Sequence, residues 1–300
     1  MEKPLFDEKF LQSLERLAIL TRRTLAGQIQ GERRSPKRGQ SVEFADYRPY
    51  ASGDDFRRID WNAYARLERF FIKLFIEEED ITVHLLVDSS RSMDWGKPNK
   101  LEYAIRLAAA LGYISMVGLD RVTVTVLGHD SRRPEHYLPP LRGKQQVFQF
   151  FSFLQSIHPD GKNPAGHLQA YAMQAASPGP VIIISDLMDD GWLNGISQLA
   201  MRGFEPTIIH LLSPDEIDPA HFTEPPLAGD FRLMDQETEQ EVEITADFET
   251  LDAYHQQLEE WQRTLYRFCS QRGAVYLPAV TSIPLDTLLF SGLRKQGILR

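Results

Sequence analysis

The chain has 300 residues, of which 42% are hydrophobic and 25% are charged, and its formal net charge is -9. This composition is typical of a globular protein, and the negative charge does not favour bulk binding to nucleic acid. The single cysteine, Cys269, excludes an intrachain disulfide framework and is typical of a reducing compartment. The N-terminus shows no signal peptide, and no run approaches the ~18 to 20 apolar residues of a membrane span. We therefore expect a cytoplasmic protein.

The first forty residues predict a helix followed by a basic loop. Apolar residues recur at helical spacing from Phe6 to Leu20. Residues 21–40 lack this periodicity and contain glycine and proline, which predicts a loop. Four basic residues cluster in it, within 31–38: Arg33, Arg34, Lys37 and Arg38. Such a cluster could contact nucleic acid or an acidic partner, but we expect a solvated loop.

Residues 41–79 interleave charged and aromatic side chains. A turn is expected at Ser52–Asp55, where Gly53 permits a positive φ, and a strand at Phe70–Ile76. Trp61 is expected in the core. Arginines and aspartates alternate through this stretch, which predicts a structural network of ion pairs. The residues are Arg48, Arg57, Arg58 and Arg66 with Asp46, Asp54, Asp55 and Asp60.

The next stretch, Ile81–Met93, combines a strand with a polar end. Its nearly continuous apolar run predicts a central strand that is covered on both faces and ends at Asp88. Ser90 and Ser92 follow at alternate positions, so an extended turn would place them on the same side as Asp88. A carboxylate with two hydroxyls suits a hard cation, namely Mg²⁺, Mn²⁺ or Ca²⁺. The alternative is that Asp88 caps the following turn and the serines are solvated.

Helices and strands alternate over the following residues. Helices are expected at 100–117, 144–157, 167–176 and 193–202, and strands at 121–127, around 181–185 and at 207–212, with a loop over 128–142. This rhythm predicts an α/β fold with a doubly wound, mainly parallel sheet. The second of the apolar strands ends in a carboxylate, Asp186, much as the first ends in Asp88. Both acids would face one crevice if these strands are neighbours.

The C-terminal part adds a hairpin and a long helix. The segments Phe231–Asp235 and Glu241–Ile244 predict a hairpin inserted near 229–245. Aromatic and aliphatic residues then recur every three or four positions from Phe248 to Phe268, which predicts an amphipathic helix packed on the sheet. A last strand at 275–277 and a closing helix at 283–290 complete the chain.

Asp88, Ser90 and Ser92 resemble the metal-ion-dependent adhesion site of von Willebrand factor A domains. The resemblance implies that Asp186, after the fourth strand of the sheet, supplies a second carboxylate. That family also uses a threonine from the loop before the third helix, and here Asn163 stands in its place. Its amide oxygen could bind the cation or a metal-bound water; alternatively the ligand is lost and Asn163 is a turn residue before Pro164. The neighbouring Lys162 would compete with a metal ion.

A longer resemblance precedes this site. The order Glu43-Phe44, Arg48-Pro49-Tyr50, Gly53 to Trp61, Ala65-Arg66 and Lys73, leading into Asp88–Met93, resembles a bacterial family called domain of unknown function fifty-eight. Members of that family resemble partners of MoxR-type AAA+ ATPases in chaperone-like maturation, so the resemblance implies such a partner. It also marks residues with structural or partner-binding roles: Arg48, Gly53, Asp54, Asp55, Arg58, Asp60, Trp61 and Arg66.

These observations predict two domains and leave three functions open. Residues 1–78 would form an N-terminal extension, and residues 79–300 a von Willebrand A-like domain. The first function is a non-enzymatic interaction module whose Mg²⁺ binds an acidic residue of a partner. The second is a Mg²⁺- or Mn²⁺-dependent phosphohydrolase or nuclease, for which the sequence lacks a Walker A motif and other catalytic motifs. The third is a metal-free scaffold with a decayed site.

Overall fold

The computed structural model describes residues 5–19, 42–51, 54, 56, 59–77, 81–130, 132–189, 191–219, 229–234, 241–246 and 248–300. These residues fall into two compact units: Met1–Ile29 with Ile81–Arg300, and Gln30–Asp80. The N-terminal helix α1 (Glu8–Leu14), which the sequence led us to group with residues 1–78, lies in the same unit as the large sheet. No helix in the described part of the chain is long and apolar enough to cross a membrane.

The larger unit is built on a six-stranded sheet in the order β10-β7-β6-β3-β4-β5. Its strands are β3 (Thr82–Asp88), β4 (Arg121–Leu127), β5 (Tyr137–Arg142), β6 (Pro180–Ser185), β7 (Glu205–Leu212) and β10 (Val275–Val280). All neighbouring pairs are parallel except β4 and β5. Chain order therefore reverses direction between β3 and β6, as it does at the switch point of doubly wound sheets. The prediction of a mainly parallel α/β sheet is confirmed.

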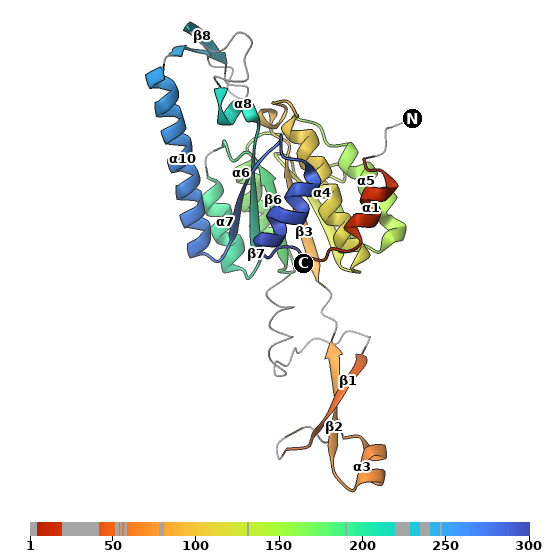
Figure 1. Cartoon of the computed structure of the whole chain (residues 1–300). Coiled ribbons are helices and arrows are strands. Elements are labelled where there is room, and N and C mark those ends of the chain that lie inside the picture. Colours follow the sequence, from red (N-terminus) through yellow and green to blue (C-terminus); the bar gives the residue numbers. More distant parts are fainter. Residues whose placement is uncertain are drawn as a thin grey trace. The chain divides into compact units, whose positions relative to one another are not determined.

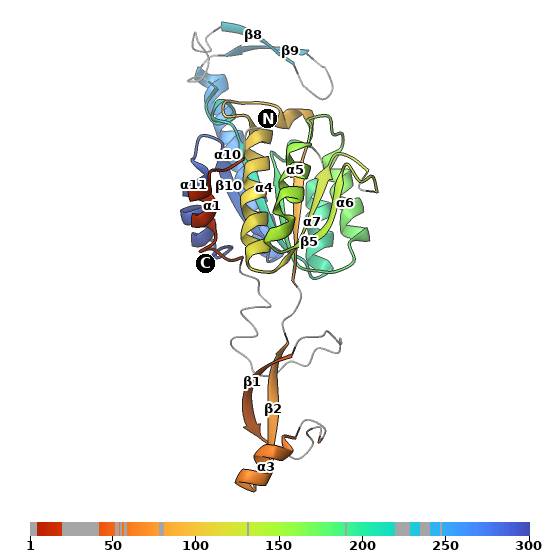
Figure 2. The same ribbon diagram turned by 90° about the vertical axis from the view of Figure 1, so that its right-hand side faces the viewer.

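Helices cover both faces of this sheet, as Figures 1 and 2 show. Apolar side chains of β3 alternate between two cores, with Val83, Leu85 and Val87 in one and Leu86 in the other. The first core is closed by α1, α4 (Lys100–Val117), α5 (Val147–Gln155), α11 (Leu285–Thr287) and the π-helical segment η4 (Leu288–Leu293). The second is closed by α6 (Pro164–Gln174), α7 (Trp192–Met201) and α10 (Phe248–Gln271). Burial on both faces explains why β3 and β6 read as continuous apolar runs.

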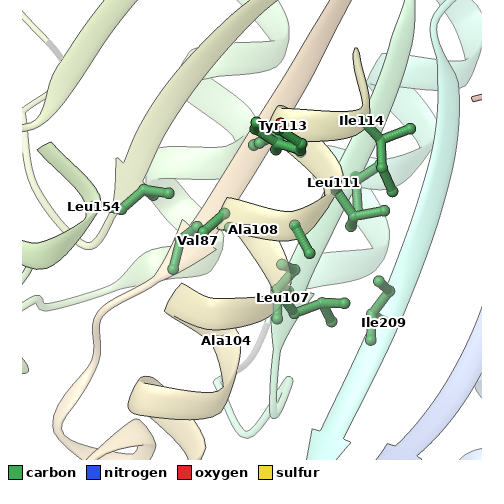
Figure 3. Packing of buried hydrophobic residues seen from close by; sticks show 14 of the residues in the cluster. Val87, Ala104, Leu107, Ala108, Leu111, Tyr113, Ile114, Leu154 and Ile209 are labelled. Carbon is green, nitrogen blue, oxygen red and sulfur yellow. The ribbon is translucent and has the colours of Figure 1, made fainter. Parts of the chain in front are cut away.

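Helix α4 is the central helix of the first core. Figure 3 shows Ala104, Leu107, Ala108 and Leu111 of α4 in the same apolar layer as Val87 of β3. Their small and branched side chains let the helix lie close to the strands. This packing fixes the N-terminus of α4 near the carboxyl end of β3, where the candidate site lies.

Two expectations for the larger unit need correction or refinement. Residues 128–142 are not all loop, because Tyr137–Arg142 form β5 at the edge of the sheet. Pro139 and Pro140 lie in this strand, and an edge strand tolerates proline because it leaves one side without ladder hydrogen bonds. A hairpin is present where one was predicted, as β8 (Gly229–Met234) pairs antiparallel with β9 (Glu241–Ala246).

The smaller unit contains the antiparallel strands β1 (Val42–Pro49) and β2 (Phe71–Glu77) and the short helix α3 (Trp61–Leu67). Asp60 caps α3 by accepting hydrogen bonds from the backbone of Asn62 and Ala63, and it also accepts one from the Tyr47 hydroxyl at 2.7 Å. Arg48 forms a two-point ion pair with Asp54, at 2.7 Å for each contact. The ion network predicted for this region is therefore present in part.

The expectation that Trp61 belongs to the core is wrong. Trp61 is 60% exposed at the start of α3, where its ring meets Tyr64 and Phe70 edge-on. Arg66 is also exposed, in the last turn of α3. Gly53, Asp55 and Arg58 lie outside the described residues, as does the basic cluster at 31–38.

Replacing Gly112 with alanine tests the close packing of α4. In an exposed helix this change would stabilise the protein by up to about 1 kcal/mol. A Cβ at Gly112 would instead lie 2.0 Å from Cζ of the buried Phe150. We expect Gly112→Ala to lower the free energy of unfolding by about 1 to 3 kcal/mol, measured by urea denaturation. The double variant Gly112→Ala/Phe150→Leu should recover part of this loss, and a stabilised single variant would contradict the packing.

His84 gives the fold a defined pH dependence. Burial lowers the pKa of His84 to about 4, while its hydrogen bond to the Ser177 carbonyl opposes the shift. The unfolded chain, with a histidine pKa of about 6.5, binds more protons between these values, so the free energy of unfolding falls as pH falls through this window. His84→Gln should reduce that slope by at most about 1.4 kcal/mol per pH unit, measured by denaturation between pH ~6.5 and ~4. Equal slopes for both proteins would contradict the assignment.

Candidate functional site

The candidate site lies where β3 and β6 end side by side. Val87 of β3 pairs with Ile184 of β6, so the next residues, Asp88 and Ser185, come from adjacent strand ends. Asp186 follows directly. Because both strands are parallel and central, their carboxyl ends open on the same edge of the sheet, at the switch point. The sequence-based expectation that the two acids face one crevice therefore agrees with the strand order.

Asp88 is held by hydrogen bonds and is almost completely buried, at 1% exposed. Its Oδ1 accepts a hydrogen bond from the Ser90 backbone at 2.8 Å, and its Oδ2 accepts one from the Ser185 hydroxyl at 2.5 Å. Ser185 in turn accepts from the Leu187 backbone at 2.9 Å. These contacts fix the carboxylate in one orientation, which a binding site requires.

The two predicted serines lie together beside Asp88. The hydroxyls of Ser90 and Ser92 are 3.0 Å apart, at the start of the single-turn helix η2 (Arg91–Met93). Ser90 is buried, and its backbone also pairs with Gly161. This pairing brings the loop that contains Asn163 alongside the motif. The edge thus gathers one carboxylate and two hydroxyls, as the alternating spacing predicted.

Asn163 performs a structural task in this loop. It is exposed, has a positive φ of 51° and caps α6, because its Oδ1 accepts a hydrogen bond from the Gly166 backbone at 2.9 Å. An amide oxygen has a second lone pair, so the cap leaves one acceptor position on Asn163. A role for Asn163 in holding a cation stays a proposal.

A buried lysine also belongs to this edge, and the sequence analysis does not single it out. The Nζ atom of Lys100 lies 2.7 Å from Oδ2 of Asp186 and 2.5 Å from Oε1 of Glu216. Burial lowers the pKa of Lys100, but the two carboxylates outweigh it and the net shift is upward. The one available signal was a lysine directly after the helix cap Asn99, at the positive end of α4, where a cation is unfavourable.

The electrostatics of Asp88 differ from those of Asp186. Burial and the charge of Asp186 raise the pKa of Asp88 to about 7, against the hydrogen bonds from Ser185 and Ser90. Within the described residues, no lysine, arginine or histidine forms an ion pair with Asp88. Asp186 has Lys100 as its counter-ion, whereas Asp88 has none in the part of the chain that the structure describes. A cation beside Asp88 would stabilise its ionised form.

The donor set fits a hard cation and no other kind of metal. Over the described part of the chain, no three His, Cys, Asp or Glu side chains come together as a metal-binding cluster. A cation at this edge would therefore depend on the serine hydroxyls as well as on the carboxylates. Mg²⁺, Mn²⁺ and Ca²⁺ accept such oxygen ligands, whereas a structural zinc site uses cysteine and histidine.

Comparison with known proteins gives relatives without an assigned activity. An uncharacterized protein of Mycobacterium tuberculosis (strain H37Rv) is 26% identical over 242 residues, which covers 77% of this chain and 72% of the relative. An uncharacterized protein of Mycobacterium bovis matches equally.

Two solved structures also align with the chain. The crystal structure of the conserved hypothetical protein BatB from Bacteroides thetaiotaomicron is 17% identical, covers 73% of this chain and 97% of that one, and aligns with a TM-score of 0.42. The pilus adhesin SpaC from Lactobacillus rhamnosus GG is 10% identical, covers 67% and 24% respectively, and aligns with a TM-score of 0.26. Neither score is high enough to carry an argument about fold or function.

The family model described as protein of unknown function DUF58 matches residues 46–264, which is more than half of the chain. The match begins inside β1 and takes in β2, α3 and the sheet strands β3 to β7, including Asp88 and Asp186. This confirms the family that the charged and aromatic segment before β3 had indicated. The chain belongs to the family of proteins of unknown function called DUF58.

Proposed function

We propose that this protein is a non-enzymatic interaction module that holds a divalent cation at Asp88 and uses it to bind an acidic residue of a partner protein. The observation that carries the proposal is a buried carboxylate, Asp88, that has no counter-ion among the described residues although it lies beside a second acid. Burying an ionised carboxylate is costly unless it is paired, so this arrangement favours a bound cation.

The ligands would come from the edge formed by β3 and β6. Asp88, Ser90 and Ser92 would hold the ion, with Asp186 and Asn163 contributing directly or through water. We expect Mg²⁺, with Mn²⁺ or Ca²⁺ as substitutes. A hard cation held by few protein oxygens keeps affinity for anionic oxygen, so the carboxylate of a partner would complete its coordination. This arrangement is the von Willebrand A-like one that the motif resembles, and the strand order supports it.

The surface around this edge suits a protein partner. The loop after β3 exposes Trp95 (48%), and the loop after β6 exposes Met188 (49%). Exposed aromatic and methionine side chains are common at protein interfaces. From the family resemblance, we propose a MoxR-type AAA+ ATPase as the partner, acting with this protein in chaperone-like maturation.

Binding is favoured over hydrolysis by the surroundings of the serines. The Ser90 hydroxyl lies against the Ser92 hydroxyl, and the buried Ser89 hydroxyl donates to the Leu127 carbonyl at 2.8 Å. In the described part of the chain no imidazole hydrogen-bonds to any of these serines. An activated serine needs an adjacent base that is itself oriented by a third group. These contacts disfavour a serine nucleophile, which is one route to hydrolysis, and are compatible with the interaction module.

Thermal melting in increasing Mg²⁺ or Mn²⁺ tests the cation site. An ion at about 100 times its Kd should stabilise the native state by about 2.7 kcal/mol. For a protein of this size the melting temperature should rise by roughly 5 to 10 °C. The rise should saturate in the wild type and be absent in Asp88→Asn, which keeps the size of the side chain but removes its charge.

Asp94→Asn is the matched control, because Asp94 is an exposed acid in the same loop. It should respond to the ions as the wild type does. A wild type that shows no saturable rise at millimolar ion, or an equal rise in Asp88→Asn, would contradict the cation site.

A further inference from the structure

Lys100 is the unexpected charge at this edge, because it is 0% exposed. Lysine is almost never fully buried unless it is paired. Lys100 is also the first residue of α4, where the positive end of the helix dipole repels an ammonium group. Both the burial and the helix position are unfavourable, so the contacts of the Nζ atom must compensate for them.

These contacts join three loops of the sheet edge. The Nζ atom bonds to Asp186 after β6 and to Glu216 in α8 (Pro214–Ile217), which follows β7. Glu216 is itself held, because its Oε2 accepts hydrogen bonds from the Ser213 backbone at 2.7 Å and from the Ser213 hydroxyl at 2.9 Å. The Tyr254 hydroxyl of α10 donates to the Glu216 carbonyl at 2.5 Å. Lys100 thus connects the candidate cation site to α8 and α10.

A count of charges shows what Lys100 does for the site. One ammonium, Lys100, faces the carboxylates of Asp186 and Glu216, and a further carboxylate, Asp88, has no cation partner among the described residues. When all four groups are ionised, their formal charge sums to about -2, which is the charge that one divalent ion balances. Without Lys100, these three buried or half-buried carboxylates would have no counter-ion among the described residues.

We propose that Lys100 is a built-in cation that sets the affinity of the site: its ammonium positions Asp186 in the metal-free protein and competes with a divalent ion for that carboxylate. The inference rests on the proposed function, because that function supplies the identity of the ion. The role of Lys100 rests on its own contacts with Asp186 and Glu216. Repulsion between the ammonium and the ion weakens metal binding, and the Lys100–Asp186 ion pair keeps the edge folded when no metal is bound. Lys100 is therefore a positioning residue: it orients Asp186 and lowers the affinity of the site, so that a bound ion dissociates readily.

Lys100→Met tests this role, because methionine keeps most of the length and removes the charge. Breaking a buried ion pair by removing one partner leaves the other charge uncompensated, so the melting temperature of Lys100→Met in EDTA should fall well below that of the wild type. Mn²⁺ should then restore stability, with half-saturation at a concentration at least ~10-fold lower than in the wild type. Lys144→Met is the matched control, since Lys144 forms an ion pair with Glu15 at the surface. The Lys144 side chain is 55% exposed and that of Glu15 is 36% exposed.

Glu216→Gln gives a second test with the opposite sign and keeps the inference testable if Lys100→Met does not fold. Without the charge of Glu216, the Lys100 ammonium pairs with Asp186 only. It then competes more strongly with the divalent ion for the Asp186 carboxylate. The half-saturating Mn²⁺ concentration should rise at least ~3-fold relative to the wild type. Unchanged half-saturation in both variants, with a wild type that binds Mn²⁺, would overturn the role of Lys100 and leave the proposed function intact.

The remaining outcomes separate the two proposals. If Mn²⁺ stabilises Lys100→Met but not the wild type, and the added change Asp88→Asn abolishes this effect, then Lys100 serves as the resident cation. That result would support the inference and overturn the proposed function of the wild type. If Mn²⁺ stabilises neither protein, both proposals are overturned.

Discussion

The candidate site depends on how negative charge is neutralised at the point where β3 and β6 end. Asp88 and Asp186 are both about 1% exposed and lie close enough for one charge to disfavour the other. Two buried carboxylates cannot both stay ionised without positive charge nearby. Among the described residues Lys100 provides a positive charge here, and it pairs with Asp186 and Glu216. The negative charge of Asp88 that Lys100 does not neutralise is the physical basis for the proposed cation and for its partner.

The strand order of the sheet brings these buried acids together. Chain order reverses between β3 and β6, and the segments that follow β3, β6 and β7 meet at the carboxyl ends of these strands. Their packing is tight: a Cβ at Gly96, in the loop after β3, would lie 2.3 Å from the Cβ of Ser213 after β7. The apolar cores on both sheet faces hold the strands that carry these loops. A charge change at Asp88 or Lys100 would therefore act on loops that already touch one another.

The sequence predicted those parts of the site that follow from local periodicity. An apolar run that ends in Asp88 or Asp186 is visible without a structure, and alternation places Ser90 and Ser92 beside the first acid. Lys100, Ser185 and Glu216 could not be predicted in this way, because their roles arise from contacts between residues 86 to 116 positions apart. A helix-starting lysine looks like any solvated lysine until its partners are known.

The sequence-based expectations that the structure corrects, and the alternatives that it leaves open, have the same physical origin. The sequence places Trp61 in the core, but it begins the short helix α3 and is exposed. Prolines suggested a loop over 128–142, yet an edge strand tolerates them in β5. Asn163 was weighed as a ligand or a turn residue, and the structure shows it capping α6. In each case the residue type indicates the local chemistry, and packing against neighbouring elements determines the burial and contacts of the residue.

The most direct test of the central claim is a crystal structure of the protein soaked in Mn²⁺, with anomalous diffraction used to locate the ion. We expect an anomalous peak within coordination distance of the oxygens of Asp88, Ser90 and Ser92, with Lys100 moved toward Glu216 or still bonded to Asp186. A crystal in which Mn²⁺ binds elsewhere, while this edge holds no ion at saturating concentration, would contradict the account.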